Sequence, residues 1–129
     1  MMKRFTILML LLSSTNVFAE WTWVDESEHY NAYVDLQTIR KKGNKAKMWS
    51  LFDYKTAQIA HDNEYWSARS INEYDCTDAT YRSLSFSFLS GKMVTGREIL
   101  NNNIKGEFEE IPPNSIIETL FKVACSKRK

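Results

Sequence analysis

Apolar and polar side chains alternate along several stretches of this chain, and a period of two residues is typical of β-strands with one buried face. The clearest stretch runs from Thr80 to Leu89, where Leu84, Phe86 and Phe88 alternate with serines. By the same criterion we predict longer strands over 45–54 and 64–76, and shorter ones over 21–25, 31–35 and 93–99. The middle of the chain is therefore predicted to be mainly β.

The C-terminal segment has a helical period instead. Pro112-Pro113 ends the strand pattern, and Ser115 and Glu118 have the spacing of a capping box, in which the serine is the N-cap. The apolar residues that follow share one face of the predicted helix: Ile116, Ile117, Leu120, Phe121 and Ala124. Because so short a helix is marginal in water by itself, we expect it to pack against the sheet.

These elements predict one α+β domain, mainly β, with an antiparallel sheet of about six strands and a C-terminal helix packed on one face. One helical turn is expected over 35–40 with Asp35 as its N-cap, followed by a tight turn at Gly43-Asn44. A chain of 129 residues has room for a single core of ordinary size.

The first nineteen residues have the pattern of a secretory signal peptide. Lys3 and Arg4 precede an apolar run from Phe5 to Leu12, and Val17-Phe18-Ala19 supplies a cleavage site. The run is shorter than the ~20 residues that span a bilayer, which disfavours a membrane anchor. We therefore predict a signal peptide at 1–19 and one exported domain at 20–129, located in the periplasm or at the outer-membrane surface.

Two cysteines occur in the chain, Cys76 and Cys125, and both lie in the part predicted to be exported. An even number of cysteines in a small exported domain indicates a disulfide, and two cysteines allow one intramolecular pairing. A C-x-x-C motif is absent from the sequence, so neither a thioredoxin-like redox centre nor a zinc ribbon is supported.

Charge is nearly balanced over the whole chain but concentrated at one turn. The 17 basic and 16 acidic residues give a net charge of +1, so composition gives no reason to expect a nucleic-acid partner. Five basic residues surround the predicted turn: Arg40, Lys41, Lys42, Lys45 and Lys47. Such a turn can bind an acidic protein surface, a sulfated polysaccharide or anionic lipid headgroups. The alternative interpretation is an exposed turn that its charge keeps soluble.

Candidate catalytic groups are sparse. The pair His61-Asp62 suits proton transfer or a metal, but the usual ligand spacings are missing and a solvated loop histidine is the simpler interpretation. Glu107, Glu109 and Glu110 form what we interpret as a solvated acidic segment. The sequence contains none of the G-x-S-x-G, P-loop or G-x-G-x-x-G motifs. We expect no enzymatic activity, no metal and no cofactor.

The order of residues along the chain resembles the surface-adhesin protein E family of exported proteins from Gram-negative bacteria. The segments that carry this resemblance are Trp21 and Trp23, Tyr33-Val34-Asp35, Ile39-Arg40, Gly43-Asn44, Lys47-Met48-Trp49, Asp53-Tyr54, Glu73-Tyr74-Asp75-Cys76, Arg82, Pro113-Asn114-Ser115 and Cys125. The resemblance implies an antiparallel sheet with a C-terminal helix, a Cys76–Cys125 bond and no catalysis. It also implies binding of host extracellular-matrix or serum proteins.

Two functions are compatible with the sequence. The first is an adhesin-like binding protein that docks a host matrix, serum or envelope macromolecule, with a protein or an acidic polysaccharide as partner. The second is a periplasmic protein of envelope maintenance, such as an inhibitor of a cell-wall hydrolase. Neither requires a transmembrane anchor, and a homodimer is compatible with both.

Overall fold

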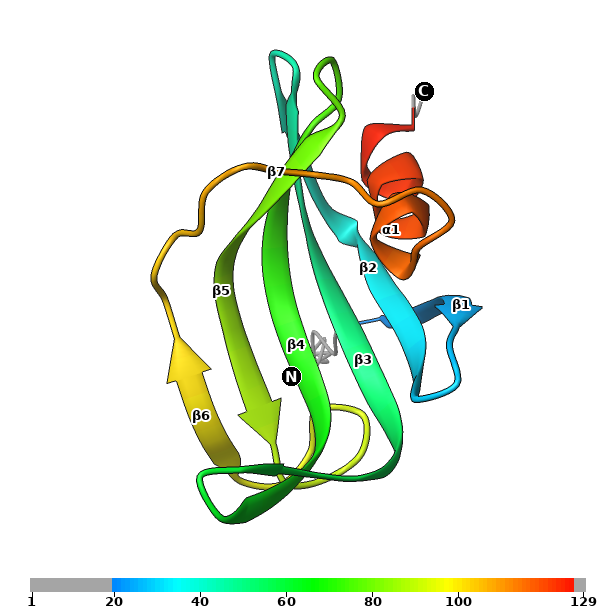
Figure 1. Cartoon of the computed structure of the whole chain (residues 1–129). Helices are drawn as coiled ribbons and strands as arrows, with labels where there is room; N and C mark the ends of the chain where they lie inside the picture. The colour runs from blue at the N-terminus through cyan, green and yellow to red at the C-terminus, as the bar shows by residue number, and fades with distance from the viewer. Residues whose placement is uncertain (1–19, 127–129) are drawn as a thin grey trace, which may run out of the picture.

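The computed structural model describes residues 20–126, so the predicted signal peptide and residues 127–129 lie outside it. Strands and one helix follow in the order β1 Thr22–Glu26, β2 Tyr30–Lys42, β3 Lys45–Ala60, β4 Asn63–Asp75, β5 Thr80–Leu89, β6 Glu98–Asn102, β7 Glu109–Glu110 and α1 Ile116–Cys125. β1 to β6 form an antiparallel sheet in chain order, and β7 pairs with the beginning of β5. The predicted fold class is confirmed (Figure 1).

The helix packs over one end of one sheet face. Leu120 and Ala124 of α1 are fully buried in one cluster with Met48 of β3 and Tyr74 of β4. Figure 1 shows α1 beside this end, where the β2–β3 and β4–β5 turns also lie. The helix begins as the capping box predicts, because the Ser115 hydroxyl accepts the Glu118 amide at 3.1 Å.

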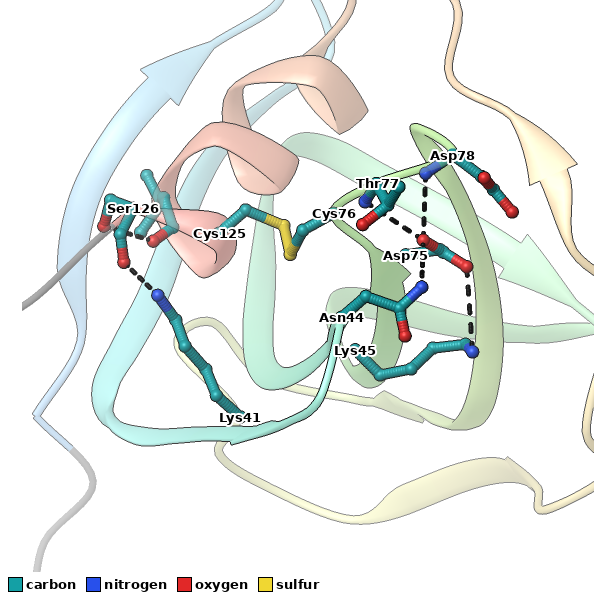
Figure 2. The surroundings of a disulfide bond; sticks show 10 residues. Lys41, Asn44, Lys45, Asp75, Cys76, Thr77, Asp78, Cys125 and Ser126 are labelled. Carbon is teal, nitrogen blue, oxygen red and sulfur yellow. Dashed lines mark hydrogen bonds and ion pairs between the residues drawn. A yellow bond between two sulfur atoms is a disulfide. The ribbon is translucent and has the colours of Figure 1, made fainter.

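The predicted disulfide is confirmed and fixes the C-terminal end of the helix. Cys76 directly follows β4, and Cys125 is the last residue of α1, with 5.7 Å between their Cα atoms. Lys41 approaches the same end from β2, and its Nζ donates to the Ser126 carbonyl (Figure 2). A cation at this position also complements the negative end of the helix dipole.

The helical turn predicted over 35–40 is wrong, because β2 continues through this segment with an irregular register between Asp35 and Arg40. The local bonds of a turn do form: Asp35 accepts the Gln37 amide at 3.1 Å, and the Thr38 hydroxyl donates to the Asp35 carbonyl at 2.6 Å. However, Thr38 also accepts the Trp49 amide of β3 at 3.0 Å. Pairing with β3 therefore converts the expected turn into a bulge.

The strand predicted over 93–99 is also misplaced. β6 begins at Glu98, and the preceding loop includes Met93 and Val94 with φ of 54° and 59°, which are incompatible with a strand. The Met93 amide donates to Asp53 at 2.8 Å, and the Val94 amide donates to Ser67 at 2.9 Å. These bonds to β3 and β4 tie the loop back onto the sheet. The acidic segment 107–110 is exposed, as interpreted from the sequence, and its last two residues pair with β5 as β7.

We predict that the disulfide makes a large contribution to stability, because it joins two residues that are 49 positions apart in the unfolded chain. The double variant Cys76→Ser/Cys125→Ser should lose about 4 kcal/mol of unfolding free energy. Urea denaturation followed by tryptophan fluorescence measures this loss, and the wild-type protein under reducing conditions is the matched control. A variant within about 1 kcal/mol of the oxidised protein would contradict the prediction.

Candidate binding surfaces

The β2–β3 hairpin divides the five predicted basic residues between the two sheet faces. Lys42 pairs with Lys45 and Arg40 pairs with Lys47, whereas Lys41 pairs with Ala46, which packs in the core beneath α1. Because side chains alternate along a strand, the first four lie on the face opposite α1. Together with Lys41 and Glu73, they border a hollow of about 380 Å³. The structure therefore brings four of the five together on one face.

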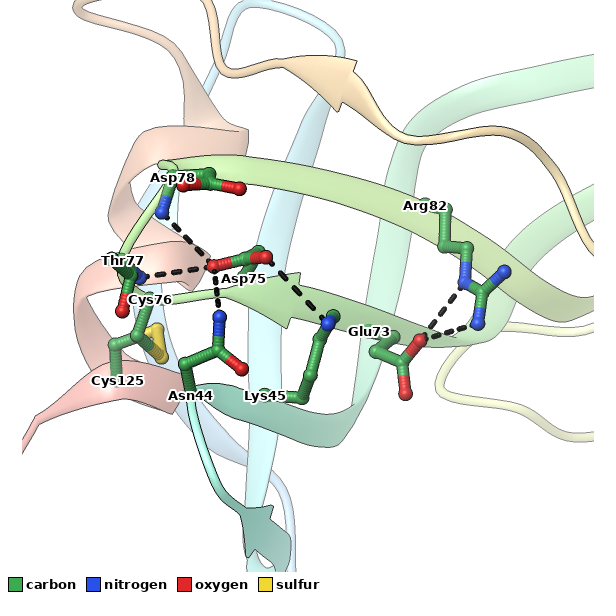
Figure 3. A network of polar contacts seen from close by, with 9 residues as sticks. All are labelled: Asn44, Lys45, Glu73, Asp75, Cys76, Thr77, Asp78, Arg82 and Cys125. Atoms are coloured by element: carbon green, nitrogen blue, oxygen red, sulfur yellow. Dashed lines mark hydrogen bonds and ion pairs between the residues drawn. A yellow bond between two sulfur atoms is a disulfide. The ribbon is translucent and has the colours of Figure 1, made fainter.

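Two acidic side chains lie beside this basic group, and each is engaged by a cation. Glu73 of β4 accepts two bonds from the Arg82 guanidinium, at 2.6 Å from Nη2 and 2.9 Å from Nε. The second acid, Asp75, lies 3.7 Å from the Lys45 ammonium. Figure 3 shows the two carboxylates with separate partners: the Asp75 contacts lie next to the disulfide, and the Glu73–Arg82 pair lies further from it.

Asp75 organises the two turns at this end of the sheet. Its Oδ1 accepts the Asn44 side-chain amide at 3.0 Å and the backbone amides of Thr77 and Asp78 at 3.1 and 2.9 Å (Figure 3). The Asp78 amide is the main reason why the pKa of the Asp75 carboxyl lies below its ordinary value, and the Thr77 amide and Lys45 act in the same direction. The ionised Asp75 carboxylate thus holds the basic hairpin next to the disulfide.

A lowered carboxyl pKa in the folded state predicts loss of stability in acid. The charged form stabilises the fold above the ordinary pKa near 3.8, and this contribution is lost as the pH falls through the lower folded-state pKa. We expect Asp75→Asn, which keeps an acceptor oxygen but lacks the charge, to melt at a lower temperature at pH 7. Below about pH 4 the difference from wild type should shrink. Thermal melts from pH 7 to pH 2 test this, and parallel curves would contradict it.

The face that carries α1 continues beyond the helix as an aromatic groove. Its six aromatic side chains are all partly exposed and come from β2, β3, β4 and β5: Tyr30, Phe52, Tyr54, Tyr65, Phe86 and Phe88. Each ring contacts the next one in a row. The ring centroids are 4.4 Å apart for Tyr30–Phe52 and 4.2 Å apart for Tyr65–Phe88, and Tyr54 packs edge-on between Tyr30 and Tyr65. We call this row of rings, together with the sheet residues between them, the aromatic groove.

The groove has a volume of about 300 Å³ and an uncharged lining. Its lining residues are Phe52, Tyr54, Ala68, Ser70, Asn72, Ser83, Phe86 and Phe88. Burial is the main reason why the pKa of Tyr54 is raised to about 12, with the neighbouring Tyr65 and Tyr30 acting in the same direction. Because none of its lining residues is charged at physiological pH, the groove offers aromatic rings together with hydroxyl groups.

Sequence reasoning did not find this groove, although one signal for it was available. A helix of ten residues is about 15 Å long, whereas a strand of sixteen residues such as β3 is about 50 Å long. Such a helix covers only part of the face. The predicted alternation in β5 was also incomplete, because the register shifts between Ser83 and Ser85 and places Ser83 on the same face as Phe86.

The sequence-predicted pair His61-Asp62 lies apart from both surfaces. His61 and Asp62 form the exposed β3–β4 turn with φ of 48° and 64°. Within residues 20–126, His, Cys, Asp and Glu side chains form no group of three suited to a metal ion. The same range contains no helix long and apolar enough to cross a membrane.

Comparison with known proteins gives consistent results in sequence and in structure. Residues 21–126 match the family described as Surface-adhesin protein E. Two solved structures of Haemophilus influenzae protein E superpose with TM-scores of 0.62 and 0.60, at 12% identity, over 79% of this chain and 91% and 87% of theirs. A third, from a non-typeable strain, has a TM-score of 0.55 at 14% identity, over 85% of this chain and 76% of that one. No curated protein sequence gives a significant match.

Proposed function

Because the chain belongs to the Surface-adhesin protein E family, we propose that it is an exported, non-enzymatic adhesin that docks a host matrix or serum protein through the aromatic groove. This proposal assigns the groove as the contact surface and a protein as the partner. It places the working protein outside the cytoplasm, in agreement with the predicted signal peptide at 1–19.

The observation that carries this proposal is the row of partly exposed aromatic rings across four strands. Protein interfaces concentrate their binding energy in a few aromatic side chains surrounded by polar groups that complete the contact. In the groove, Phe52 and Phe86 supply apolar contact area, while the partly exposed Ser70 and Ser83 supply hydrogen-bonding groups. Neighbouring rings already limit the motion of each aromatic side chain, so little conformational entropy remains to be lost on binding.

We predict that Phe86→Ala weakens binding to the host protein by at least tenfold, because it removes one of the two β5 phenylalanine rings that line the groove. Ile59→Ala is the matched control, since Ile59 is an apolar β3 residue that is 64% exposed and lies outside the groove lining. Binding is measured by surface plasmon resonance against a panel of matrix and serum proteins, with a thermal melt of each variant. Equal effects of the two substitutions in folded proteins would contradict the assignment of the groove.

The alternative function, a periplasmic protein of envelope maintenance, differs from the adhesin in location. Digestion of intact cells with an external protease is expected to remove the protein if it works as an adhesin. Complete protection on intact cells, with release only by osmotic shock, would contradict the adhesin proposal.

A further inference from the structure

The outer face of the β2–β3 hairpin carries four cations in two directly opposed pairs, which we call the cation array: Arg40, Lys42, Lys45 and Lys47. Opposed residues of an antiparallel pair lie about 5 Å apart, and alternate residues of one strand about 7 Å apart. Like charges directly opposite one another destabilise a sheet. The array is therefore an unfavourable feature of the isolated fold, as expected of a site that an external anion completes.

Neighbouring acids leave most of this charge unpaired. Lys47 lies opposite Glu73 in the β3–β4 register, but Arg82 already holds the Glu73 carboxylate at 2.6 Å. Asp75 lies within ion-pair distance of Lys45 alone. In the part of the chain that the structure describes, Arg40, Lys42 and Lys47 therefore form no ion pair.

Arg40 is held in place without losing its charge. Its Nη1 donates to the backbone carbonyls of Gln37 at 2.8 Å and Ile39 at 3.0 Å. Carbonyl oxygens orient the guanidinium but do not neutralise it. The remaining donors of its planar fork are available to a sulfate or carboxylate group.

The lining of the hollow favours a ligand that offers charge more than apolar area. Its six residues are all charged, whereas a protein partner usually inserts an aromatic or aliphatic anchor into a pocket at the interface centre. Phe108 is a nearby exposed ring, but two cations already cover it: the Arg82 guanidinium lies 4.5 Å and the Lys45 ammonium 5.5 Å from the ring centroid. A flexible linear polyanion, by contrast, can bind through its charges alone, provided that the cations are suitably spaced.

We propose that the cation array is a second binding site, and that its ligand is a sulfated polysaccharide chain. The site lies on the sheet face opposite the aromatic groove, so the two surfaces can be occupied together. The inference shares with the proposed function only the export of the chain, which gives the array access to extracellular polysaccharide.

The test uses the oxidised protein on immobilised heparin at about 0.15 M salt, where long-range electrostatic effects are largely screened. Lys42→Ser and Lys47→Ser should each weaken binding about two- to fivefold, and the double variant about tenfold, as expected for exposed ion pairs. Lys122→Ser removes the same charge from an exposed position on α1, on the opposite sheet face and outside the hollow, and should change binding by less than about twofold. Because it removes like-charge repulsion, Lys47→Ser should not lower the melting temperature.

Three results would overturn this assignment. The first is no retention of the wild-type protein on heparin, and the second is equal loss of binding in Lys122→Ser and Lys47→Ser. The third is equally tight binding to double-stranded DNA, which would indicate attraction to any polyanion. Phe86→Ala should retain full heparin binding, so a failure of the groove and a failure of the cation array give different results.

Discussion

Leu120 and Ala124 of α1 pack against Met48 and Tyr74 at one end of the sheet, and the remainder of the structure depends on this contact. Full burial of a side chain such as Leu120 contributes about 1.5–3 kcal/mol, and the disulfide at the end of α1 holds the short helix on the sheet. The same contact limits what the helix can cover. Because α1 is much shorter than β3, the face beyond it stays partly open as the aromatic groove.

The sequence was most informative where one local pattern decides the structure. The alternation in Thr80–Leu89 and the capping box at Ser115 each lie within a few residues, and both elements were predicted correctly in type and place. The segments 35–40 and 93–99 were mispredicted because distant residues determine them. Bonds from β3 turn the first into a strand bulge, and the second begins as a loop tied to Asp53 and Ser67.

The two candidate surfaces also differ in whether neighbouring or distant residues form them. The basic residues were visible in the sequence because they are nearly contiguous, but only the strand register shows that Lys41 belongs to the opposite face. The aromatic groove was not visible because its rings come from four strands, and residues as distant as Tyr30 and Phe88 belong to one row only in the folded sheet. The sheet thus separates a neutral, aromatic surface from a cationic one, and each suits a different class of partner.

The helix α1 buries one end of its sheet face and leaves the other end open as the aromatic groove. Hydroxyl-radical footprinting of the oxidised protein, read out by mass spectrometry, tests it most directly because it reports the solvent access of each aromatic side chain. We expect oxidation of Phe52, Phe86 and Phe88 together with protection of Tyr74, which is fully buried beneath α1. If the groove residues were protected as strongly as Tyr74, the groove would be closed and α1 would not leave this end of the face open.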